Sequence, residues 1–76
     1  TYLFLVRSVE DVLKYIKSQL AEAEKVMKDA EESLRLAELM NIDVADARLR
    51  YEQAKRRYMQ LKAGFEKYLA EKGIKL

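Results

Sequence analysis

The stretch AELMNIDVADA, residues 37–47, decides the fold, because it interrupts two long regular patterns of apolar residues. Asn41 tolerates the left-handed backbone conformation in which many helices end. Asp43 is predicted to cap the next helix with its side chain, which places Asp46 in the first turn, near the positive end of the helix dipole. A connection as short as residues 41–43 joins helices that lie side by side and run antiparallel.

Before this break, apolar residues recur at alternating intervals of four and three, which is the heptad pattern of a coiled coil. They are Val9, Leu13, Ile16, Leu20, Ala23, Met27, Ala30, Leu34 and Ala37. We assign Leu13 to heptad position a and Ile16 to position d. The pattern predicts a helix over residues 9–40, and Ser8 with Asp11 forms a variant of the capping box at its start.

After the break, the pattern resumes with intervals of three and four. Its members are Val44, Ala47, Tyr51, Ala54, Tyr58, Leu61, Phe65 and Tyr68. These residues and those of the first pattern are together called the seam. The second pattern predicts a helix over residues 44–72, ended by Gly73 in the left-handed conformation with Ile74 as its hydrophobic contact.

The chain is therefore predicted to be a single all-α module of 76 residues, an antiparallel two-helix hairpin of the coiled-coil type. Residues 1–8 form an apolar arm, residues 41–43 the turn and residues 73–76 a C-terminal tail. Two Gly, no Pro and 37% charged residues agree with a helical chain.

The chain is short for a protein that folds alone. At this length one hydrophobic core contributes only about 3–5 kcal/mol to the free energy of unfolding. The chain has no Cys for a disulfide. We therefore expect the hairpin to complete a helical bundle by oligomerisation.

The register of the two helices can be estimated from side-chain size. Pairing seam residues whose numbers sum to 81 sets a large side chain opposite a small one near the turn, as in Ala30 with Tyr51 and Ala23 with Tyr58. Farther from the turn, both partners are large, as in Ile16 with Phe65. We expect that end of the hairpin to be wider.

Further apolar residues lie outside the seam and predict a second interface. In the first helix they occupy heptad positions g and c, and five consecutive apolar residues precede the helix. The predicted self-association residues are Tyr2, Leu3, Phe4, Leu5, Val6, Val12, Tyr15, Val26, Leu36 and Met40. Glu22 and Asp29 interrupt the set, so scattered surface apolar residues are the alternative interpretation. The partner would be a second copy or another helical protein.

The first seven residues, TYLFLVR, lack the basic segment and cleavage site of a signal peptide. They extend the helix or form a strand, and the sequence does not decide between these. With Arg7, Lys14 and Lys17 they also suggest membrane-surface binding as a minor alternative. No apolar run is long enough for a transmembrane segment. Because the chain does not begin with Met, we expect a processed product, a fragment or an engineered protein, and no compartment is indicated.

The second half of the chain is basic: residues 43–76 carry nine basic and five acidic side chains, against six and eight in residues 1–42. Arg48, Lys55 and Lys62 take heptad position e and face the e positions of the first helix, which are Lys17, Glu24, Glu31 and Glu38. This arrangement predicts that three acidic residues meet three basic residues across the interface, also if the register slips by one heptad. Arg50, Arg56 and Arg57 remain unexplained. They define the alternative function, a nucleic-acid-binding hairpin.

The sequence does not predict an enzyme. It contains no His and no Cys, which removes the commonest general base and the usual ligands of transition metals. Neither Gly64 nor Gly73 has a second glycine near it, so there is no phosphate-binding loop. We expect no catalytic residue, cofactor or metal.

The segment NIDVADA, residues 41–47, resembles the turn of helical-hairpin segments in archaeal surface and stalk proteins, which often read Gly-Ile-Asp-Val-x-x-Ala. The resemblance covers about residues 30–60. Asn41 stands where that pattern has Gly. The resemblance implies a spacer or assembly role without catalytic residues. A designed helical hairpin with no natural function would carry the same capping residues, and it is retained as a further alternative.

Overall fold

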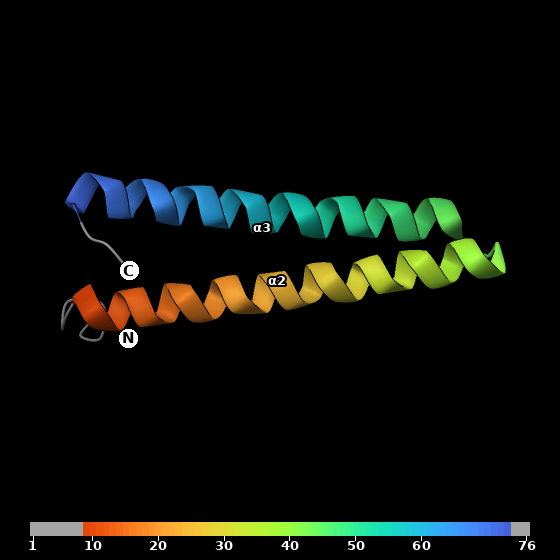
Figure 1. Ribbon diagram of the computed structural model, residues 1–76, viewed down its shortest axis with the longest axis horizontal. Helices are drawn as coiled ribbons and strands as arrows, with labels where there is room; N and C mark the ends of the chain where they lie inside the picture. Colours follow the sequence, from red (N-terminus) through yellow and green to blue (C-terminus); the bar gives the residue numbers. More distant parts are fainter. Residues whose placement is uncertain (1–8, 74–76) are drawn as a thin grey trace.

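The computed structural model describes residues 9–73, and within them the chain forms two α-helices joined by a short turn. Helix α2 spans Val9–Met40 and helix α3 spans Val44–Lys72. The helices run antiparallel and lie side by side (Figure 1). Both helix boundaries match the prediction, and the described residues contain no strand. The predicted cap at Ser8, the arm residues Tyr2–Val6 and the Ile74 contact lie outside the described residues.

Helix α2 ends in a hydrogen-bonded motif at Asn41. Asn41 has a φ of 56°. The backbone N–H of Ile42 donates to the carbonyl oxygen of Ala37 at 3.0 Å, and the N–H of Asn41 donates to that of Glu38 at 3.3 Å. These are the two bonds of a Schellman motif, which satisfies carbonyl groups that a helix end otherwise leaves free. The left-handed conformation predicted for Asn41 is confirmed.

The predicted side-chain cap at Asp43 is wrong. Asp43 occupies the N-cap position of α3, but its side chain makes no capping hydrogen bond. Its backbone is left-handed, with φ 51° and ψ 37°, whereas capping side chains usually act from an extended backbone. Asp43 contributes its carbonyl oxygen instead, which accepts a hydrogen bond from the N–H of Ala47 at 3.0 Å.

The end of α3 is as predicted. Gly73 has a φ of 66°, and its N–H donates to the carbonyl oxygens of Ala70 and Leu69. Glycine adopts this conformation without the steric cost that a Cβ imposes.

The seam is the contact between the helices. Every seam residue from Leu13 to Phe65 is buried or half-buried, whereas Val9 and Tyr68 at its outer end are exposed. In α3 the sole other residue that is not exposed is Leu69. Among the described residues only Ala23 is fully buried, with 6% of its surface accessible. The seam therefore holds the hairpin together without forming a closed core.

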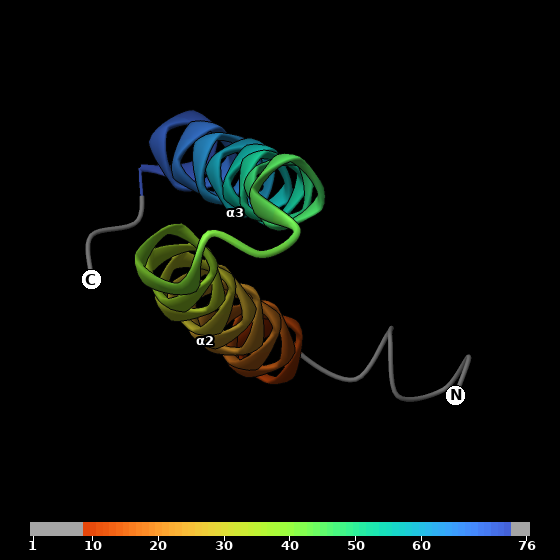
Figure 2. The same cartoon turned by 90° about the vertical axis from the view of Figure 1, so that its right-hand side faces the viewer.

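The hairpin is a rod one helix thick. Its extents are 50 × 25 × 16 Å and its radius of gyration is 16.4 Å. A compact globule of this length would have a radius of gyration of about 11 Å. Figure 1 shows that the helices diverge away from the turn, as the large side-chain pairs at that end predict. Viewed along the rod in Figure 2, the described residues form one layer, and neither broad face carries a second layer of helices.

Candidate interaction surface

Two faces flank the seam, and they differ in chemistry. One is called the charged face; it carries Lys17, Glu24, Glu31 and Glu38 of α2 and Arg48, Lys55 and Lys62 of α3. The charged face has a hollow of about 540 Å³ beside Lys17, Glu24 and Lys62. The other face is called the groove face, because hollows follow it from the end far from the turn to the turn itself. It carries Val12, Gln19, Glu22, Val26, Asp29, Ser33, Leu36 and Met40 of α2 and Arg50, Arg57 and Gly64 of α3.

Within residues 9–73, one ion pair joins the two helices on the charged face. Arg48 Nη2 lies 3.8 Å from Glu38 Oε2 and so connects the two helices beside the turn. Among the described residues, Glu24 pairs within α2 with Lys28 at 4.0 Å, and neither Glu31–Lys55 nor Glu24–Lys62 forms an ion pair. Of the acidic and basic e residues expected to meet across the interface, Glu38 and Arg48 alone form an ion pair in the described part of the chain.

The other two basic e residues, Lys55 and Lys62, lie over tyrosine rings of their own helix. Lys55 Nζ lies 5.9 Å from the centroid of the Tyr51 ring, and Lys62 Nζ lies 5.9 Å from that of Tyr58. Residues four apart share a helix face, so each lysine reaches the ring one turn before it and covers the edge of the seam. At an exposed site such a contact contributes about 0.5–1 kcal/mol. In the sequence, a Tyr followed four residues later by a Lys indicates such a contact. Heptad positions alone do not show it.

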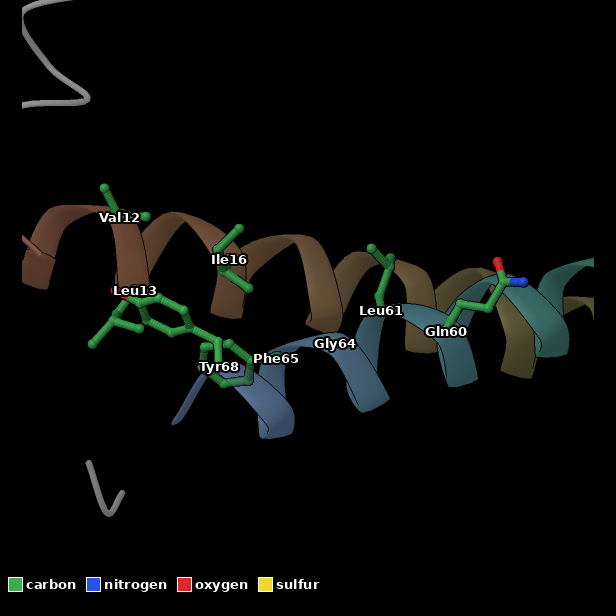
Figure 3. A pocket seen from close by; sticks show the side chains of 8 residues that line it. All are labelled: Val12, Leu13, Ile16, Gln60, Leu61, Gly64, Phe65 and Tyr68. Atoms are coloured by element: carbon green, nitrogen blue, oxygen red, sulfur yellow. The ribbon is translucent and has the colours of Figure 1, made fainter. Parts of the chain in front are cut away.

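The groove face begins, at the end far from the turn, with an apolar hollow of about 400 Å³. Figure 3 shows Leu13 of α2 beside Phe65 and Tyr68 of α3, with Ile16 and Leu61 farther along the seam. Gly64 contributes no side chain to the wall, and a Cβ added there would meet no atom within 4 Å. The divergence of the helices therefore leaves apolar side chains around open space.

Two further hollows continue along the same face towards the turn. The middle one, of about 230 Å³, is lined by residues that include Glu22, Val26 and Arg57. The one beside the turn, of about 620 Å³, is lined by residues that include Val26, Leu36, Met40 and Ile42. Val26 and Ala54 line both hollows, so the two form one continuous surface.

The structure brings together some of the predicted self-association residues. Val26, Leu36 and Met40 line the hollow beside the turn and are 48%, 57% and 57% exposed. Val12 is half-buried in the apolar hollow at the other end. Tyr15 is exposed but lines none of these hollows, and Tyr2–Val6 lie outside the described residues. Ile42 was not among the predicted residues; it is exposed because it lies in the turn, two residues after the end of α2.

The three arginines singled out for nucleic-acid binding do not share one face. Arg50 and Arg57 lie seven residues apart on the groove face, and Arg50 Nε is 3.2 Å from Asp46 Oδ2. Arg56 precedes Arg57 and therefore points about 100° away around the helix. All three side chains are exposed.

Comparison with known proteins adds no assignment: the chain matches no protein-family model, no curated protein and no solved structure. The resemblance of residues 41–47 to archaeal hairpin turns therefore stays a prediction. Within residues 9–73, no group of acidic side chains is arranged to hold a metal ion. Neither helix in this part of the chain has the length and apolar character needed to cross a membrane.

Proposed function

We propose that the chain is a non-enzymatic assembly module, which self-associates or docks on another helical protein through its second helical face and its apolar N-terminal arm. The observation that carries this proposal is the imbalance between buried and exposed apolar residues. Among residues 9–73 only Ala23 is buried, while Leu36, Met40 and Ile42 are each more than half exposed beside the turn. Exposed apolar residues gathered in this way are typical of an interaction site.

The energetics of a two-helix rod support the same proposal. A hairpin buries one side of each helix, and here even the seam residues remain mostly half-buried. The chain has no disulfide to restrict its unfolded state. Its solvent-accessible surface is 6324 Å², whereas a compact monomer of 8.9 kDa would expose about 4800 Å². A partner that covers the exposed apolar residues would supply the missing burial.

The N-terminal arm belongs to the proposed interface on the basis of its sequence. Five consecutive apolar residues, 2–6, are separated by two residues from the first residue of α2, and the apolar hollow lies at this end of α2. Such a segment favours aggregation when it is left in water. Covering it by a partner chain would remove that hazard.

Sedimentation velocity of the full chain at about 1–100 µM tests the proposal, since weak helical assemblies dissociate within this range. We expect the sedimentation coefficient to rise with concentration towards that of a defined oligomer. A helical chain that stays monomeric throughout would contradict self-association. Nucleic-acid binding is retained only as the alternative prediction, because no specific feature of the described residues favours it.

A further inference from the structure

We propose that the groove face binds the groove face of a second copy, with the two hairpins related by a two-fold axis parallel to their length and with their turns at the same end. This inference rests on the proposed self-association and adds the face and the orientation. In this arrangement α2 of each copy packs over α3 of the other, so the four helices form an antiparallel bundle.

Charge complementarity carries the proposal. Glu22 and Arg57 line opposite sides of the middle hollow, and Asp29 and Arg50 line the hollow beside the turn. Within residues 9–73, none of Glu22, Asp29 and Arg57 takes part in an ion pair. The two-fold axis along the rod places α2 of the second copy opposite α3 of the first. Residues that are equally far from the turn then face each other. Glu22 of one copy then faces Arg57 of the other, and Asp29 faces Arg50, whose Nε also lies 3.2 Å from Oδ2 of Asp46 in its own helix. Glu22 and Arg57, unpaired among the described residues, therefore contribute most to the complementarity.

The opposite orientation lacks this complementarity. With the turns at opposite ends, α2 would pack on α2 and α3 on α3. The acidic residues Glu22 and Asp29 of both copies would then share one half of the interface, and Arg50 and Arg57 of both copies the other. Juxtaposed like charges oppose association. The charge pattern of the groove face therefore selects the orientation with both turns together.

Shape agrees with the same orientation. Val12 and Gly64 both line the apolar hollow at the end far from the turn. The two-fold axis sets the apolar hollows of the two copies against each other, and a Cβ added at Gly64 would meet no atom within 4 Å there. The rod offers a face of 50 × 25 Å, which exceeds the roughly 800 Å² that each partner of a stable complex usually buries.

The orientation can be measured with one spin label on each copy. Ala45 is exposed beside the turn, and the chain contains no Cys, so an Ala45→Cys variant carries a single label site. Packed helices lie about 10 Å apart, so we expect a distance below about 30 Å between the labels of a dimer. A distance near the 50 Å length of the hairpin would overturn the proposal by showing that the turns lie at opposite ends.

Charge reversal tests the residues. We expect Arg57→Glu alone and Glu22→Arg alone each to raise the dissociation constant about tenfold or more, and the double variant to restore most of the affinity. Arg56→Glu is the matched control and should change it less than about threefold, because Arg56 lies off the groove face. If both single variants associate as the wild type does, or if the double variant is not rescued, Glu22 does not face Arg57 of the second copy and the proposed orientation is wrong. A monomeric wild-type chain would instead contradict the proposed function itself.

Discussion

Arg48 of α3 and Glu38 of α2 form an ion pair across the helix interface, with Arg48 Nη2 3.8 Å from Glu38 Oε2. The pair lies beside the turn, on the charged face. Its side chains are 59% and 43% exposed, so water and salt screen the attraction strongly. The pair favours the register of the hairpin more than it stabilises the fold.

We therefore expect Arg48→Gln and Glu38→Gln each to lower the free energy of unfolding by no more than about 1 kcal/mol. A double-mutant cycle measured by urea unfolding gives the coupling energy of the pair. The coupling should shrink further in 0.5 M NaCl. A coupling above about 2 kcal/mol would show that the pair is far less solvated than its exposure indicates.

The left-handed backbone of Asp43 leads to a prediction that separates two accounts of this residue. Serine caps helices as well as aspartate does, but it does not favour the left-handed conformation. Since Asp43 makes no capping hydrogen bond, Asp43→Ser should lower the free energy of unfolding by about 1 kcal/mol. Asp43→Gly should preserve stability, because glycine adopts a positive φ readily. Equal stability of the serine variant and the wild type would instead indicate that the side chain of Asp43 caps α3.

Ala23 is the most buried residue in the described part of the chain, with 6% of its surface exposed. A leucine there would force the helices apart, so Ala23→Leu should lower the free energy of unfolding by about 1–3 kcal/mol. Ala21→Leu is the matched control, because Ala21 is exposed on the same helix and should tolerate the change. Urea unfolding of both variants checks the prediction. Equal effects of the two substitutions would contradict the packing at Ala23.

An assembly module should not bind nucleic acid with useful affinity. Arg50, Arg56 and Arg57 do not form one basic patch, and Arg50 is already paired with Asp46. We expect no binding to a short DNA duplex or a single-stranded RNA by fluorescence anisotropy at 50 mM salt. Binding that weakens steeply with added salt, and that an Arg50→Ala, Arg56→Ala and Arg57→Ala triple variant loses, would favour the alternative function.

The sequence predicted the helices well because the signals that define them are local. The heptad intervals placed the seam, and Asn41 and Gly73 marked helix ends where the backbone is left-handed. The widening of the hairpin away from the turn also followed from side-chain size. These features depend on residues within one helix or one turn, or on the volume of facing side chains.

The failures concern residues with several available partners. Lys55 and Lys62 were assigned to acidic residues across the interface, but their own helix offers a tyrosine ring one turn away. Asp43 was assigned a side-chain cap, but the tight turn requires a backbone conformation that does not favour it. The continuity of the groove face depends on which residues of two helices lie level with one another. Heptad positions alone do not give that register.

Thermal unfolding followed by circular dichroism over a hundredfold range of chain concentration tests the central claim, that a partner completes the hairpin. If folding is coupled to association, the midpoint temperature rises with concentration, because mass action favours the assembled state. We predict such a rise, together with loss of helicity at the lowest concentration. A midpoint that is independent of concentration, in a chain that stays helical and monomeric, would contradict the account.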